Sequence, residues 1–344
     1  MNRRALQRGT LPAIMTVFLC ASLSMPQAAA ASEADFPTAR ETSVALAGLQ
    51  KMRQDRLLAR QPNVLDFMFE NSKERVFDAH LTDELGDLSF NTAKGRQSWA
   101  VVESNWTRSE SSSLQYSFAS LGAHKKLNNR FYIGAMAELD AADRKVDADA
   151  SGDGVGFLVG PYLAGRLPKT ELDWSMRLLH GRTNNQFAPD GSIRRDAESQ
   201  RTLFQARMEG RFEMGTTELT PNIIASHVNE LTDHFRIADG TRIDGEELSL
   251  SQFSAGVEFA HPLESSWAKM GLTGQFALVA QHSMGTGLLD EAYPATDWFT
   301  SRVEVGVDMD RKGLGTLSTR FGVDGVEGDL TDQIHLSLMF ERKL

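Results

Sequence analysis

The feature that most constrains the fold is a strict alternation of side chains in residues 202–214, T-L-F-Q-A-R-M-E-G-R-F-E-M. From Phe204 onward every second residue is apolar or small, and each residue between is charged or, at Gln205, an amide. Successive side chains of a β-strand point to opposite sides, so the segment has one apolar and one charged face as a strand. A helix would scatter the same polar side chains around its axis. The run also exceeds the roughly 9–11 residues with which a tilted strand crosses a bilayer.

The same alternation recurs along the chain after residue 97, and it predicts about twelve strands. The predicted strands are residues 98–106, 113–125, 130–140, 154–165, 171–181, 200–214, 217–228, 248–262, 268–281, 298–309, 314–323 and 332–344. Their connections alternate in length. The short ones are 127–129, 168–169, 215–216, 264–266 and 311–313, and the longer ones are 141–153, 182–199, 229–247, 282–297 and 324–331. This rhythm is typical of a transmembrane antiparallel up-and-down β-barrel, with short periplasmic turns and longer external loops.

The charged face of each of these strands is predicted to point into the barrel lumen. An Arg or Lys that faced lipid near the bilayer midplane would cost about 2–4 kcal/mol, so the charged side chains must meet water or opposite charges inside. The residues predicted to face the lumen are Arg207, Glu209, Arg211, Glu213, Arg302, Glu304 and Asp308.

Composition agrees with an exported barrel rather than a helical membrane protein. Hydrophobic residues make up 41% of the chain, mean hydropathy is -0.31, and no run of 18 apolar residues follows residue 31. The formal net charge is -10. An acidic chain is a poor partner for polyanions, so nucleic acid is not expected to bind.

Residues 1–31 are predicted to be a cleaved secretory signal peptide. Three arginines open the segment, residues 11–23 are apolar, and the alanines at 28–30 fit a cleavage site. The single cysteine, Cys20, lies within it. The mature chain is therefore expected to have no disulfide and no cysteine metal site.

Residues 32–96 are predicted to contain a helix and a linker that the pattern does not assign further. Residues 41–60 have helical character and end shortly before Pro62. One face of this helix is basic, and two readings stay open: a plug inside the lumen, or a solvated helix face. For the plug, the cations that would meet carboxylates of the lumen are Lys51, Arg53, Arg56 and Arg60.

The remaining motifs favour neither a metal site nor an enzyme. Asp147, Asp149 and Asp153 imitate the start of a calcium loop, but the closing acid is missing. The glycines at 152, 154 and 156 lack the helix that a phosphate cradle needs. Histidines near strand ends have no accompanying nucleophile motif. No cofactor, no metal and no catalytic residue is predicted.

Several segments resemble a known family. They are G-P-Y-L-A-G-R-L at 160–167, E-L-D-W-S-M-R-L-L-H-G-R-T-N-N at 171–185, T-E-L-T-P-N-I-I-A-S-H at 217–227 and F-S-A-G-V-E-F at 253–259. In this order they resemble the translocator β-domain of autotransporters, over residues 97–344. The stretch A-G-L-Q-K-M-R-Q-D-R-L-L-A-R-Q-P at 47–62 resembles the segment that precedes the barrel in that family.

The resemblance implies a twelve-stranded outer-membrane barrel whose lumen is threaded by a helix that leads to an exported passenger. It also implies outer-membrane lipid and the barrel-assembly machinery as partners, and a monomer is expected. Only about 65 residues separate the predicted signal from the first predicted strand, so we expect little or no passenger. The alternative function is a passenger-less porin or a surface adhesin that acts through its lumen or its external loops.

Overall fold

The computed structural model describes residues 39–69, 76–81, 85–91, 97–108, 112–146, 150–188, 195–236, 242–290, 293–311, 315–324 and 334–341. The predicted signal peptide lies outside these residues. The helices are α1 (Ala39–Ala59), α2 (Val64–Phe69) and the short 3-10 helix η1 (Gly287–Leu289). The strands are β1 (Val76–Leu81), β2 (Leu85–Asn91), β3 (Ser98–Arg108), β4 (Ser112–Lys126), β5 (Phe131–Val146), β6 (Ala150–Arg166), β7 (Leu172–Ala188), β8 (Arg195–Gly210), β9 (Phe212–Met214), β10 (Thr217–Thr232), β11 (Phe235–Arg236), β12 (Arg242–Ile243), β13 (Glu247–Leu263), β14 (Lys269–Gly285), β15 (Thr296–Arg311), β16 (Gly315–Asp324) and β17 (Ile334–Glu341).

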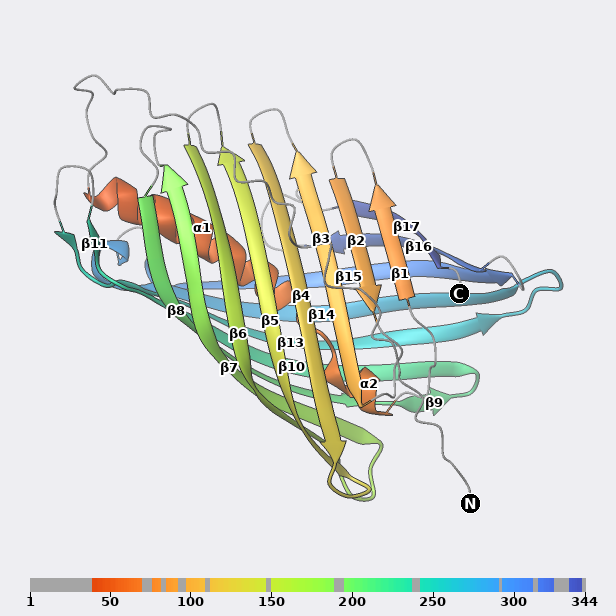
Figure 1. Cartoon of the computed structure of the whole chain (residues 1–344). Helices are drawn as coiled ribbons and strands as arrows, with labels where there is room; N and C mark the ends of the chain where they lie inside the picture. The colour runs from red at the N-terminus through yellow and green to blue at the C-terminus, as the bar shows by residue number, and fades with distance from the viewer. Residues whose placement is uncertain are drawn as a thin grey trace, which may run out of the picture. The chain divides into compact units, whose positions relative to one another are not determined.

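The strands form one up-and-down antiparallel sheet in which chain neighbours pair with one another. Within the described residues its path runs from β1 to β17 through fourteen strands, and β9 attaches to β10. The first and last strands of the path, β1 and β17, lie in contact. Figure 1 shows the sheet curving around α1, which lies on its inner side. The all-β, antiparallel barrel fold predicted from the alternation is confirmed.

Each of the twelve predicted strands has its counterpart from β3 to β17. The short connections at 127–130, 167–171, 215–216 and 264–268 all lie at one end of the barrel, which we call the turn end. At the opposite end, the loop end, the strands run farther than expected, and much of the predicted loops 182–199 and 229–247 is strand. β1 and β2 come from the linker that the sequence left unassigned, and they extend the sheet ahead of β3.

The alternation of β8 follows the predicted phase. The side chains of Gln205 and Glu209 are 8% and 4% exposed. The side chain of Phe204, on the opposite face of β8, is 36% exposed. The predicted strand 200–214 is interrupted after Gly210, although β9 keeps the same register against β10. The interruption lies opposite Pro221, which has no N–H to donate to the ladder.

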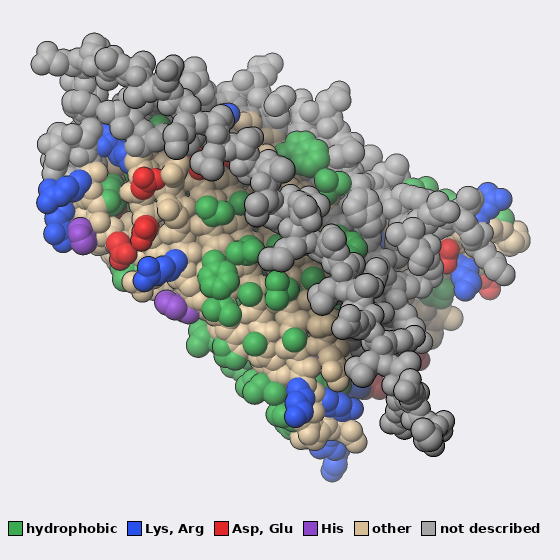
Figure 2. Space-filling view, in the orientation of Figure 1, with side chains coloured by type: hydrophobic (Ala, Val, Ile, Leu, Met, Phe, Trp, Pro, Cys, Tyr) green, Lys and Arg blue, Asp and Glu red, His purple; other side chains and the backbone are tan. Residues whose placement is uncertain are grey.

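The outer face of the sheet is apolar over most of its length. Figure 2 shows hydrophobic side chains across the middle of the visible face, with charged side chains and histidines gathered toward its ends. Exposed apolar side chains of neighbouring strands include Leu139, Val155, Phe157, Leu163 and Leu178. Such an apolar band is the lipid-facing surface of a transmembrane barrel. Among the described helices, none is long and apolar enough to span a membrane.

Candidate functional site in the lumen

The helical segment 39–69 passes through the lumen from the loop end to the turn end. Near the start of α1, Leu46 belongs to an apolar cluster with Phe187, Ala197, Phe235 and Ile243, all from loop-end segments. At the far end, the ring of Phe67 in α2 stacks on Trp99 with a centroid distance of 4.6 Å. Trp99 lies at the turn-end start of β3. Apolar contacts therefore hold the segment at both ends of the barrel.

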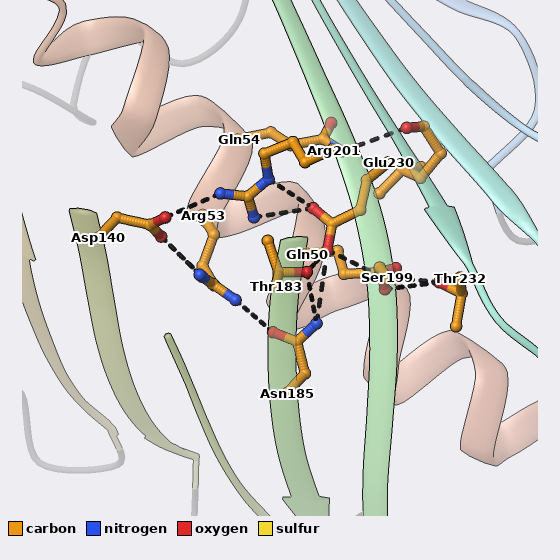
Figure 3. Close-up of polar contacts among 11 residues, drawn as sticks. Gln50, Arg53, Gln54, Asp140, Thr183, Asn185, Ser199, Arg201, Glu230 and Thr232 are labelled. Atoms are coloured by element: carbon orange, nitrogen blue, oxygen red, sulfur yellow. Dashed lines mark hydrogen bonds and ion pairs between the residues drawn. The ribbon is translucent and has the colours of Figure 1, made fainter. Parts of the chain in front are cut away.

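Between these ends, two arginines and two acids form a buried ionic network (Figure 3). Arg53 of α1 donates from Nε and Nη2 to Asp140 Oδ2 of β5, at 2.9 and 2.7 Å. Arg201 of β8 donates to Asp140 Oδ1 at 2.9 Å and to Glu230 Oε2 of β10 at 2.8 Å. All four side chains are at most 2% exposed. The network is electrically neutral only when Arg53 is present, and Arg53 is its one member on the helix.

Neutral polar side chains complete the hydrogen bonding around this network. Gln50 Nε2 lies 3.0 Å from Ser199 Oγ, 3.1 Å from Glu230 Oε1 and 2.9 Å from Thr232 Oγ1. The Thr183 hydroxyl donates to Glu230 at 2.6 Å, and Arg53 donates to Asn185. Buried charges are tolerated when their hydrogen-bonding groups are paired in this way, so one helix turn is tied to four strands.

The glycines of β6 provide the space that the helix occupies. A Cβ atom on Gly154 would lie 2.6 Å from Arg53 Nη1, and one on Gly156 would lie 2.7 Å from Arg53 Nη2. A Cβ on Gly152 would approach Leu49 to 3.2 Å. The glycines at 152, 154 and 156 therefore leave a groove in the barrel wall that receives the side chains of Leu49 and Arg53.

The basic residues Lys51, Arg53 and Arg60 form ion pairs with acids other than the lumen-facing acids predicted from the sequence. Lys51 pairs with Asp55 of the same helix at 3.0 Å, and Arg60 pairs with Glu103 of β3 at 3.1 Å. Arg56 lies 3.3 Å from the amide oxygen of Asn105 when that amide is turned to satisfy its neighbours. Asp140 of β5 and Glu103 of β3 are thus the wall carboxylates that pair with Arg53 and Arg60.

A family model described as autotransporter beta-domain matches residues 93–325. The chain belongs to this autotransporter β-domain family. A similar solved structure is the translocator domain of the autotransporter NalP from Neisseria meningitidis, with 14% identity, a TM-score of 0.52, and 88% of this chain and 97% of that chain covered. The transport unit of AIDA-I from Escherichia coli gives 11% identity, a TM-score of 0.49 and coverages of 88% and 96%. No curated protein sequence matched the chain.

As a member of this family, the chain is an outer-membrane β-barrel. The NalP likeness supports the fold, and the family match covers strands β3 to β16. The two short strands β1 and β2 precede the matched residues.

Five of the seven residues predicted to face the lumen of this autotransporter barrel gather around one cavity, four in its lining and Asp308 through Arg320. Arg207, Glu209, Arg211 and Glu304 line a polar cavity of about 470 Å³ at the turn end, beside α2. Arg207 pairs with Glu209 at 2.9 Å, and Asn63 donates to the same carboxylate at 3.0 Å. Asp308 pairs with Arg320 at 2.7 Å. Glu213 on β9 and Arg302 on β15 are exposed.

At the loop end, a buried glutamate ties two segments together near the start of α1. Glu246, which precedes β13, is 4% exposed. Its carboxylate accepts a hydrogen bond of 3.1 Å from the backbone N–H of Leu288 in η1. Burial raises the pKa of the Glu246 carboxyl, and the Leu288 hydrogen bond opposes this rise. Because η1 contacts α1, this bond helps to enclose the helix at the loop end.

Proposed function

We propose that this autotransporter β-domain moves the segment that precedes α1 across the outer membrane and then retains α1 as a plug that anchors it. The observation that carries the proposal is the course of residues 39–69, together with the neutral ionic network that Arg53 completes. A helix with such specific partners in the barrel wall is built to stay in the lumen.

The direction of the helix supports export rather than periplasmic retention. In barrels of this type the short turns lie on the periplasmic side and the longer loops outside. The start of α1 packs among loop-end residues, whereas α2 packs on Trp99 at the turn end. The residues ahead of α1 then emerge on the outer side, after removal of the signal peptide 1–31.

The same arrangement favours an anchor over an open porin. A porin needs a continuous path of water, whereas here the loop-end half of the lumen holds the fully buried side chains of Gln50 and Arg53. We further propose a non-enzymatic monomer that needs no cofactor, binds no nucleic acid, contacts outer-membrane lipid and is inserted by the barrel-assembly machinery.

A surface-labelling experiment tests the proposed function. An epitope tag inserted after residue 31 is expected to bind antibody on intact cells, because the helix delivers its N-terminal side to the outside. The matched control carries the same tag in the turn at 215–216, which should bind antibody only after the outer membrane is permeabilised. If both tags need permeabilisation, the segment is not exported and the proposal is wrong.

A further inference from the structure

The turn end of β4 to β7 carries a group of exposed cations. Lys125 and Lys126 are the last residues of β4, Arg130 lies just before β5, and Lys169 lies in the turn between β6 and β7. All four residues are exposed, and Figure 2 shows Lys and Arg side chains gathered at the lower tip of the visible face. We call these four residues the basic rim.

The acids of the same two turns do not balance the basic rim. Asp173 is bound by Arg166, which donates to its two carboxylate oxygens at 2.6 and 2.7 Å. In residues 124–131 and 165–173, all of which the structure describes, Glu171 is then the one acid left to oppose four cations. The excess of positive charge is local, because the chain as a whole has a formal net charge of -10.

Local contacts hold the basic rim in place. Asn128 Oδ1 accepts a hydrogen bond of 2.8 Å from the backbone N–H of Arg130, which closes the turn between β4 and β5. The backbone carbonyl of Arg130 accepts a bond of 2.9 Å from the N–H of Arg166, so this turn is tied to the end of β6. The ammonium group of Lys126 lies 6.0 Å from the centroid of the Tyr132 ring. The cations therefore lie on two turns that are joined to each other.

The basic rim adjoins the lipid-facing surface of the barrel. Lys125 lies in the same cross-strand row as Ile133 and Leu163, which are exposed on the outer face. One position closer to the turn end, the ring of Phe131 packs edge-on against Trp174, with the centroids 6.1 Å apart. Aromatic residues at the end of an apolar band mark the level of the lipid headgroups. The cations therefore lie at that level, directly below hydrocarbon-facing side chains.

We propose that the basic rim binds an anionic phospholipid of the phosphatidylglycerol type in the periplasmic leaflet. The short turns of such barrels lie on the periplasmic side, where the leaflet of an outer membrane consists of phospholipids. Unbalanced cations at the membrane surface attract an anionic headgroup, whereas a zwitterionic headgroup brings an ammonium group of its own. The phosphate lies against Lys125 and Arg130, and one acyl chain lies over Ile133 and Leu163. The proposal depends on the orientation of the barrel but not on export or on the plug.

Native mass spectrometry of the full mature protein tests the proposal. The protein is equilibrated in detergent with equimolar phosphatidylglycerol and phosphatidylethanolamine, and it should retain phosphatidylglycerol in preference. The combined variant Lys125→Gln, Arg130→Gln and Lys169→Gln should lower the ratio of the two bound lipids about tenfold, because each cation near the membrane surface adds to the attraction. These side chains are exposed, so the variant should keep the heat-modifiable migration of a folded barrel.

The matched control removes three exposed cations at the loop end instead, with Lys145→Gln, Arg182→Gln and Arg242→Gln. It has the same net charge as the first variant and should keep the wild-type ratio. A phosphatidylglycerol with a photoreactive acyl chain should label the segments around Ile133 and Leu163. Equal retention of the two lipids by the wild-type protein, or an equal loss of preference in both variants, would overturn the proposal.

Discussion

Deleting residues 39–69 is expected to turn a closed barrel into an open, conducting one. The deletion removes α1 and α2, and with them the side chains that fill the lumen between the loop-end cluster and Trp99. It leaves β1 and β2 in place, because these strands extend the barrel wall ahead of β3. In planar bilayers, the truncated protein should show stable single-channel steps of conductance that the full mature chain lacks.

The matched control removes only residues 32–38, which leaves both helices intact. It should remain as closed as the full mature chain. Large, stable channels in the control, or equal conductance with and without residues 39–69, would show that the helical segment does not seal the lumen.

Replacing Arg53 with methionine is expected to release the helix from the barrel. Without Arg53, the buried group formed by Arg201, Asp140 and Glu230 has one uncompensated negative charge. Breaking a buried ion pair by removing one partner costs about 3–5 kcal/mol. Lys51→Met is the matched control, since Lys51 is 33% exposed and pairs within its own helix. Loss of such an exposed pair costs about 0.2–1 kcal/mol.

The measurement is the frequency of channel opening, together with protease cleavage within residues 39–69 of the folded barrel. Arg53→Met should raise both strongly, and Lys51→Met should raise neither. Adding Asp140→Asn to Arg53→Met restores neutrality and should recover part of the closure, as a double-mutant cycle can measure. Equal behaviour of the two single variants would mean that the network does not hold the helix.

Much of the barrel was predictable because lipid imposes one simple rule on every strand. A charged side chain that faces hydrocarbon is costly, so the sequence of each strand shows which residues face lipid and which face the lumen. Residues 202–214 illustrate this, with Phe204 outside and Gln205 inside. The ladder break after Gly210 lies opposite Pro221 in the next strand, and a single-strand pattern cannot reveal it.

The network around Arg53 was missed because the strands are longer than the membrane requires. A bilayer needs about 9–11 residues of tilted strand, whereas β7 has 17 and β10 has 16. Thr183, Asn185 and Glu230 therefore fell within predicted loops although they lie on inward strand positions. The inward alternation of residues 217–228 continues unbroken to Glu230 and Thr232, and that continuation was the available signal.

The partners of the helix cations were not predictable from the pattern of any one strand. Asp140 and Glu103 lie on inward phases, as do Glu209 and Glu304, so the sequence offered several acids of equal merit. The choice depends on the stagger between strands and on the rotation of α1 within the lumen. The glycines at 154 and 156 give a partial clue, because residues without side chains on the inner wall mark where a bulky partner fits.

The central claim is that α1 lies in the lumen with Gln50 against β8 and β10. The most direct measurement is crosslinking of cysteines introduced at Gln50 and Thr232, whose side chains are 2.9 Å apart, in a chain with Cys20 changed to serine. Cysteines at Ser104 and Ser117, whose hydroxyls are also 2.9 Å apart across β3 and β4, serve as the positive control. Both pairs should be joined by a short crosslinker in outer membranes. Crosslinking of the control pair alone, with residues 39–69 open to protease, would contradict the account.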